Sequence, residues 1–210
     1  GRDALDLATL ADSAGCVERL LRAGASAERA GAGGKSAVHL AASRGASRAL
    51  ASLLSVAPAM ASAVCSNLTP LHLAAAGNHA WCIAALVAVR AELDALAAGE
   101  HAALHLAAAQ GGGDAVAALL DGGAQVDVVS PKSGKTPLHV ACQHGNPRAA
   151  FRLLDAGASP HHVDASGAST MHWACKGGRT DVVARLLDAR VDADAPSRRG
   201  SRPIHLACEA

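Results

Sequence analysis

Aromatic side chains are almost missing from this chain: its 210 residues include two Trp, one Phe and no Tyr. Half of the residues are nevertheless hydrophobic, and alanine supplies much of that half. A single globular core of this size normally uses more large side chains to fill its interior. Small apolar residues suit short elements that approach one another closely, so we expect an architecture built from many such contacts.

A strong charge of one sign, a long apolar run and paired cysteines are absent as well. The formal net charge is +1, so no global field indicates nucleic acid or a membrane surface as a partner. The sequence has no apolar run of the length that membrane insertion needs, and residues 1–3 do not resemble a signal peptide. Six cysteines without a CxxC pair do not form a disulfide scaffold in a chain of this length. We therefore expect a cytoplasmic or nuclear protein.

What the chain does contain is a six-residue motif that recurs at a nearly constant interval. It reads TPLHLA at residues 69–74 and TPLHVA at residues 136–141, with looser copies elsewhere. The seven copies start near residues 3, 36, 69, 102, 136, 169 and 202, so the spacing is 33 residues with one exception of 34. Chance does not produce seven registers of this kind.

This motif and its period resemble the ankyrin-repeat family, whose units carry T-P-L-H-x-A every 33 residues. The resemblance covers essentially the whole chain. It implies an all-α fold: an ankyrin-repeat solenoid of stacked helix-turn-helix units with projecting β-turn finger loops, forming a single domain over residues 1–210. The seventh copy stops after one helix and leaves Ile204 and Leu206 poorly covered, so we expect the chain to be a fragment of a longer protein.

The helix caps and turn residues of one unit predict its two-helix shape independently of the family resemblance. Thr69 is a good N-cap for a first helix, and Pro70 follows at the first helical position, where its missing N–H costs nothing. Asn78 stands where other copies have a glycine, at a left-handed position that ends this helix. Arg90 and Arg190 take the left-handed position after the second helix, where a residue other than glycine costs roughly 1 kcal/mol. We expect those two turns to be distorted or weaker.

Histidine is abundant, with 11 residues, but the pattern favours structure over chemistry. One position in six successive copies is always histidine: His39, His72, His105, His139, His172 and His205. In the family this side chain bonds to backbone and to the Thr of the motif, so the resemblance implies a structural role. The adjacent His161 and His162 have no third ligand at metal spacing, and we expect no metal and no cofactor.

Cysteine and the short motifs lead to the same conclusion. Cys142, Cys175 and Cys208 share one first-helix position and are expected to be small buried residues, whereas Cys65, on a finger, is expected to be the most exposed thiol. Ser133-Gly134-Lys135-Thr136 ends like a phosphate-binding loop but lacks the glycine that such a loop needs five residues earlier. Because no catalytic constellation appears, we predict that the chain is not an enzyme.

The two tryptophans occupy different positions in their copies. Trp173 replaces the leucine of the motif and is interpreted as a packing variant, and Trp81 lies near the start of a second helix, where it is expected to be partly exposed and is a candidate contact residue. The single 34-residue spacing lengthens the finger at residues 128–135, and Pro131 stiffens it. Since loops carry variation and function, this finger is a candidate specificity element.

The resemblance also implies where a partner binds: on the concave side, at the finger tips and at outward positions late in each first helix. Carried over copy by copy, the predicted partner-binding residues are Lys35, Arg44, His101, Gln110, Lys132, Lys135, Gln143, His144, Lys176, Arg198 and Arg199. The basic ones gather in copies five to seven, opposed mainly by Glu209 and Asp164. We therefore expect a partner protein or peptide that is acidic toward the C-terminal repeats and apolar in the middle.

Other interpretations remain open. The basic residues could be solvated loop charges without a partner, and nucleic acid is not expected because the positive groove is short and lacks stacking aromatics. As a function we predict an adaptor or scaffold. One alternative is a substrate-recruiting subunit of a ubiquitin ligase, although no SOCS box lies within these residues. A second is a regulator resembling the inhibitor-of-NF-κB family. A third is the targeting module of an enzyme whose catalytic domain lies outside this chain.

Overall fold

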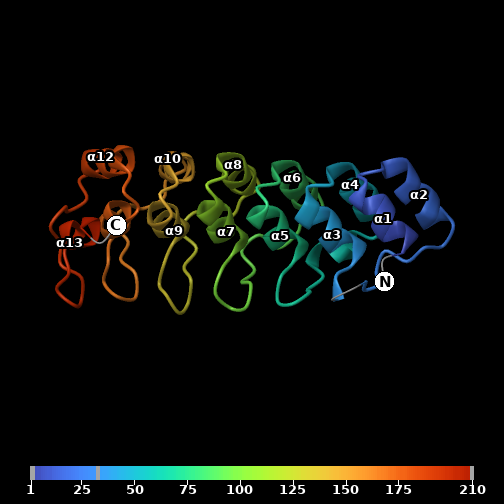
Figure 1. Ribbon diagram of the computed structural model, residues 1–210, viewed down its shortest axis with the longest axis horizontal. Helices are drawn as coiled ribbons and strands as arrows, with labels where there is room; N and C mark the ends of the chain where they lie inside the picture. The colour runs from blue at the N-terminus through green and yellow to red at the C-terminus, as the bar shows by residue number, and fades with distance from the viewer. Residues whose placement is uncertain (1–2, 32–33, 209–210) are drawn as a thin grey trace.

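Short helices pair along the chain and stack in two rows, with hairpin-like fingers projecting beyond the inner row (Figure 1). The computed structural model describes residues 3–31 and 34–208. The inner row, next to the fingers, consists of α1 (Ala4–Leu10), α3 (Ala37–Arg44), α5 (Pro70–Ala76), α7 (Ala103–Gln110), α9 (Pro137–Gln143), α11 (Thr170–Lys176) and α13 (Pro203–Ala207). The outer row consists of α2 (Ala14–Arg22), α4 (Ser47–Val56), α6 (Ala80–Ala88), α8 (Gly113–Asp121), α10 (Pro147–Asp155) and α12 (Thr180–Asp188).

The start of every motif copy coincides with the N-cap of an inner helix, at residues 3, 36, 69, 102, 136, 169 and 202. At Thr69 the hydroxyl accepts the backbone N–H of His72 at 3.5 Å, and Pro70 follows as the first helical residue. The predicted repeat register and the all-α solenoid are confirmed. A short 3-10 helix, η2 (Pro58–Ser62), adds a feature between α4 and the next finger that the repeat pattern did not predict.

The core is a continuous seam between the rows rather than a central globule. Leu71, Leu104 and Leu138 of the inner row and Leu86 and Leu119 of the outer row are fully buried, each contributing roughly 2 kcal/mol of apolar burial. Helices of this length do not form stably alone in water. Stacking on neighbouring units therefore supplies the stability, as it does in other solenoids.

The left-handed turns form as predicted, but they are not distorted. Arg90 and Arg190 adopt φ angles of 60° and 59°. The N–H of Arg90 donates to Val87 O at 2.8 Å and the next N–H donates to Leu86 O at 3.0 Å, the same pair of bonds that closes the turn at Gly24. The expected distortion was wrong because the side chain of a left-handed residue strains only its own backbone. The hydrogen bonds of the turn are unaffected.

The expectations for cysteine were correct only in part. Cys65 is buried, not exposed. Its backbone N–H and C=O both pair with Leu68 at 2.9 Å, which places it in the stem of a tight finger and not at the tip. Cys142 is buried, Cys175 is half-buried and Cys208 is exposed. Cys208 lies at the end of the described stack, where no further described helix covers it.

The C-terminal end of the stack is uncovered as predicted for Ile204, which is 61% exposed, while Leu206 is half-buried. The predicted opposing residue Glu209 lies outside the described residues. No described helix combines the length and the apolar character that a membrane crossing requires.

The candidate specificity finger takes up its extra residue within the turn. Ser130 N–H donates to Lys135 O at 2.9 Å, whereas the equivalent bond of the next finger joins Asp164 to Ala168, one residue closer in sequence, at 3.0 Å. Lengthening the loop between paired ends costs little free energy. The stacking of α7, α9 and α11 therefore continues without a break (Figure 1).

Candidate partner-binding groove

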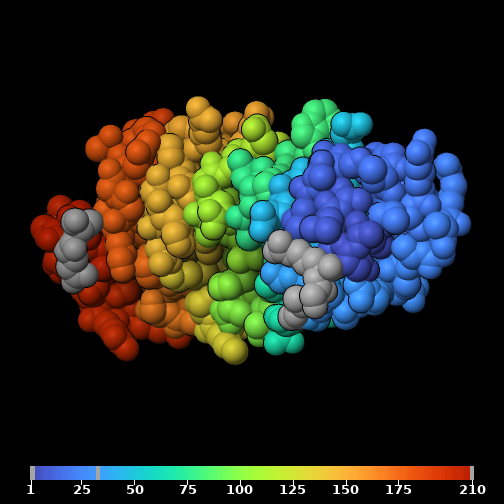
Figure 2. Space-filling model, turned by 45° about the vertical axis from the view of Figure 1, so that its right-hand side comes forward, coloured from blue at the N-terminus to red at the C-terminus, as the bar shows by residue number. Residues whose placement is uncertain are grey.

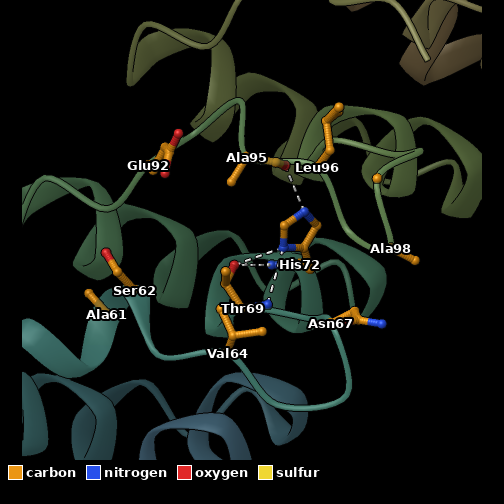
Figure 3. A pocket seen from close by; sticks show the side chains of 11 residues that line it. Ala61, Ser62, Val64, Asn67, Thr69, His72, Glu92, Ala95, Leu96 and Ala98 are labelled. Carbon is orange, nitrogen blue, oxygen red and sulfur yellow. Dashed lines mark hydrogen bonds between the residues drawn. The ribbon is translucent and has the colours of Figure 1, made fainter. Parts of the chain in front are cut away.

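A ladder of five buried histidines joins α3, α5, α7, α9 and α11 each to the chain segment of the following finger. His72 Nε2–H donates to Ala95 O at 2.9 Å, while its Nδ1 accepts the backbone N–H of Thr69 at 3.2 Å (Figure 3). His139 makes the equivalent bonds, to His162 O at 3.1 Å and from the N–H of Thr136 at 3.2 Å. The predicted structural role is confirmed for His39, His72, His105, His139 and His172. His205 differs: its side chain is exposed and accepts the backbone N–H of Arg202 at 3.1 Å.

Both ring nitrogens of these histidines are occupied, and the rings are buried, which determines their protonation. Burial lowers the pKa of His105 and of His139 to about 4, so both rings are neutral at physiological pH. A hollow of about 310 Å³ borders His72 between two fingers (Figure 3). Because the ring of His72 already uses both nitrogens, it offers no free donor or acceptor to that hollow.

A second hollow, of about 390 Å³, lies on the finger side of the inner row between copies four and five. We call it the central hollow. Four of the predicted partner-binding residues line it: His101, Lys135, Gln143 and His144. Leu106, Ala109 and Val140 give it an apolar lining. Small apolar surface ringed by a few polar groups is the usual composition of a recognition site.

The polar groups around the central hollow are held in place by hydrogen bonds within and between units. His101 Nδ1 pairs with Ser130 Oγ at 3.1 Å, across the boundary between two fingers. The exposed His144 donates its Nδ1–H to Val140 O at 3.0 Å, which directs the ring. Glu100 accepts the backbone N–H of Ser133 at 3.2 Å and so fixes the position of the next finger. These side chains are therefore positioned before any partner arrives.

A cluster of charged and aromatic groups lies next to the central hollow. The Lys135 ammonium sits 3.6 Å from the centroid of the Trp173 ring, and that of Lys176 sits 5.4 Å from it. The indole N–H of Trp173 donates to Asp164 Oδ2 at 3.0 Å, and the Lys135 ammonium also bonds to the Gln143 side chain. The interpretation of Trp173 as a packing variant missed this cation–π arrangement.

The charges in this cluster have shifted pKa values. Burial lowers the pKa of Lys135, since loss of hydration outweighs the attraction of Asp164. Burial disfavours the charged form of Asp164, but hydrogen bonds from Ser166, Ala168 and Trp173 hold its pKa below the usual value. Asp164 is buried, so its charge acts on the cluster from beneath the surface.

The remaining predicted residues are spread along the finger side of the array. Arg44, Gln110, Lys132, Lys176, Arg198 and Arg199 are exposed, and Lys35 is half-buried. Arg198 donates to Ala165 O at 2.7 Å and thereby joins the sixth and seventh fingers. The structure places these residues without testing binding, so their partner role stays a prediction. Among the described residues, no group of three or more His, Cys, Asp or Glu side chains is arranged to hold a metal ion.

Comparison with known proteins agrees with the geometry. The model of the family described as ankyrin repeats (3 copies) matches residues 5–97, 91–164 and 143–210. The ankyrin repeat domain of human ASB11 superposes with a TM-score of 0.86 at 22% identity, covering 98% of this chain and 92% of that one. The ankyrin repeat domain of Bcl-3, described as a unique member of the IkappaB protein family, gives 0.84 at 25% identity, covering 99% and 94%. A search of curated protein sequences found no match.

Proposed function

Because the chain belongs to the ankyrin-repeat family, a family of protein–protein interaction modules, we propose that it binds a partner protein or peptide along the concave groove and acts as an adaptor or scaffold. The groove is the surface made of the finger tips and the outward residues late in each inner helix. The observation that carries the proposal is the central hollow, where four predicted contact residues meet around an apolar lining. An apolar hollow ringed by a few positioned polar groups supports recognition of a partner.

The chemistry of the groove suggests the chemistry of the partner. Lys132, Lys176 and Arg199 are exposed in copies five to seven, and none of them forms an ion pair with another described residue. Opposite charge on a partner steers its approach and sets its orientation. An extended segment with an apolar residue for the central hollow, followed by acidic residues toward the C-terminal copies, fits both features.

One more specific role has support beyond the fold. The likeness to Bcl-3 extends over almost the whole of both chains, and the lengthened finger at 130–135 is similar to a feature of the inhibitor-of-NF-κB family. A transcription regulator of that kind, working in the cytoplasm or nucleus, is our second candidate. The likeness to ASB11, at 22% identity, concerns the fold alone. A ubiquitin-ligase role and a role as the targeting module of an enzyme therefore gain no support from this likeness beyond the fold.

A peptide-display selection tests the groove directly, since it needs no identified partner. Random 12-residue peptides are selected on the full chain and then measured on a triple variant, Lys132→Glu, Lys176→Glu and Arg199→Glu. We expect enrichment of peptides with acidic residues at one end. Binding of these peptides should weaken at least 10-fold in the variant and lose its salt dependence.

The matched control reverses three exposed arginines of the outer helices: Arg19→Glu, Arg148→Glu and Arg152→Glu. It carries the same change in net charge as the groove variant. Because the three arginines lie on the outer row, away from the groove, it should bind the selected peptides like the unmodified chain. Equal loss in both triple variants would show a general charge effect. Full binding by the groove variant would reject the basic groove.

A further inference from the structure

The outer row carries one residue that breaks its own pattern. The second residue of each outer helix occupies an equivalent position: Gly15, Arg48, Trp81, Asp114, Arg148 and Asp181. Trp81 is 81% exposed, so it is not held there by packing. A large aromatic side chain left in water in the middle of a polar row is a common mark of an interface.

The helix that bears Trp81 is unusual throughout its length. The sequence of α6 is AWCIAALVA, without a charged residue, whereas α2, α4, α8, α10 and α12 each carry at least one. Trp81, Ala84 and Ala88 are exposed at helical spacing and form one face, which we call the α6 patch. Figure 2 shows side chains with the colour of this part of the chain standing out at the upper edge of the molecule.

The charges beside the α6 patch have opposite signs. Arg48 precedes Trp81 by one unit of the stack and Asp114 follows it by one unit. Both are exposed, and neither forms an ion pair with another described residue. A two-fold rotation axis parallel to α6 would place Arg48 opposite Asp114 of a second copy, and Asp114 opposite Arg48. The surface is therefore complementary to itself, as an isologous dimer interface requires.

We propose that two copies of this chain associate back to back through the α6 patch, with the two Trp81 rings in contact and the two stacks running in opposite directions. The charges select this arrangement over the other two-fold choice. A two-fold axis parallel to the direction of stacking would place each helix against the same helix of the second copy, running the opposite way. Asp114 would then lie opposite Asp121 of the second copy, and the two negative charges would repel each other. The antiparallel arrangement places Asp121 opposite Ser55 instead.

The arrangement leaves the concave grooves free. The α6 patch lies on the outer row, and the fingers project on the far side of the inner row (Figure 1). The dimer would therefore present two grooves facing away from each other, and a partner with two binding segments would gain avidity. This inference does not rest on the proposed function, because self-association is measured without a partner.

Sedimentation equilibrium of the full chain at concentrations from about 1 µM to 1 mM tests the proposal. We expect a monomer–dimer equilibrium in this range and an increase of about 30-fold in the dissociation constant for Trp81→Ala, as for a central aromatic anchor. The exposed position of Trp81 means that this variant folds normally, which circular dichroism verifies. A chain that stays monomeric throughout, or dimerises equally well without Trp81, would overturn the proposal.

A charge exchange tests the orientation. Arg48→Asp and Asp114→Arg should each weaken the dimer several-fold, and the double variant should recover most of the loss because the pair is restored with its signs reversed. Asp181→Arg is the control, since this residue lies two units beyond Asp114 and has no counterpart across the axis. Additive loss in the double variant would contradict the antiparallel dimer. Binding of the α6 patch to anionic lipid vesicles without any self-association would also contradict it.

Discussion

The Lys135 ammonium lies 3.6 Å from the centroid of the Trp173 ring, across the boundary between the fifth finger and the sixth inner helix. The same indole donates its N–H to Asp164, which belongs to the sixth finger. One side chain thus connects two successive fingers to α11. A partly desolvated cation–π contact contributes about 1–2 kcal/mol, and a hydrogen bond to a charged group contributes a similar amount.

Replacing Trp173 by leucine, the residue at the same position in five other copies, should remove both interactions. We expect the free energy of unfolding to fall by about 2 kcal/mol, measured by urea denaturation. Trp173→Phe is the matched control, because it keeps a ring face for Lys135 and loses only the N–H donor. Its loss should be about half as large. Equal stability of the leucine variant and the unmodified chain would show that the cluster does not stabilise the fold.

Acid should destabilise the array before its carboxylates titrate. The folded pKa of His105 and His139 is about 4, below the unfolded value of roughly 6.5. Between these values the unfolded chain binds more protons, so stability falls as the pH falls. Full stability is present above about pH 6.5, and up to roughly 3 kcal/mol per histidine is lost toward pH 4.

Urea midpoints measured at pH 7.5, 6.5, 5.5 and 5 should therefore decrease steadily. His139→Asn should lower stability at pH 7.5, because the C=O of His162 loses its donor, and it should also make the decrease with pH shallower. A midpoint that is constant from pH 7.5 to 5 would contradict the neutral, buried state of these rings.

Glycine should stabilise the two strained turns. Arg90 and Arg190 hold φ angles of 60° and 59°, a region that favours glycine by roughly 1 kcal/mol. Arg90→Gly and Arg190→Gly are each expected to raise the thermal midpoint by about 2–4 °C. Ala189→Gly is the control: its φ is −79°, so glycine there only adds freedom to the unfolded chain and lowers the midpoint. Lower midpoints for both arginine variants would show that these side chains stabilise the turns by contacts.

Gly177 lets two inner helices approach closely. A Cβ at this position would lie 2.1 Å from the backbone oxygen of Cys142, so Gly177→Ala must push α9 and α11 apart. We expect a loss of about 1–3 kcal/mol in the free energy of unfolding. Gly15→Ala is the opposite case, since a Cβ there meets nothing within 4 Å and alanine is the better helix former, so it should gain up to about 1 kcal/mol. The same sign for both variants would contradict the close approach.

Several features of the fold could be predicted from the sequence because they depend on residues near each other in the chain. Asn78 adopts a left-handed φ of 56° as expected, since the preference of that position is local. The candidate groove was partly predictable in the same way: counting from the motif identified His101, Gln143 and His144, which do meet at the central hollow. Position within a repeat determines which side of the stack a residue faces.

Prediction failed where the outcome depended on a neighbouring unit. Nothing in the residues around Cys65 distinguishes a finger tip from a finger stem, because the length of its turn is decided by how the loop pairs. The exposed position of Trp81 was expected, but the charges that flank it come from α4 and α8, about one helix spacing of 8–10 Å away on either side. The 33-residue spacing of Arg48, Trp81 and Asp114 already aligns them in one row, but the structure alone shows that both charges are exposed and form no ion pair with another described residue.

The sequence by itself determined the 33-residue register and the positions of the helix caps, because these depend on hydrogen bonds and backbone preferences within one unit. The structural role of the motif histidines followed from the family resemblance. The tertiary structure alone decided that Lys135 lies over Trp173, that Cys65 is buried and that Gly177 contacts the backbone of Cys142. Those contacts join side chains and backbone of different units. Their geometry follows from how closely the units stack, which no single repeat specifies.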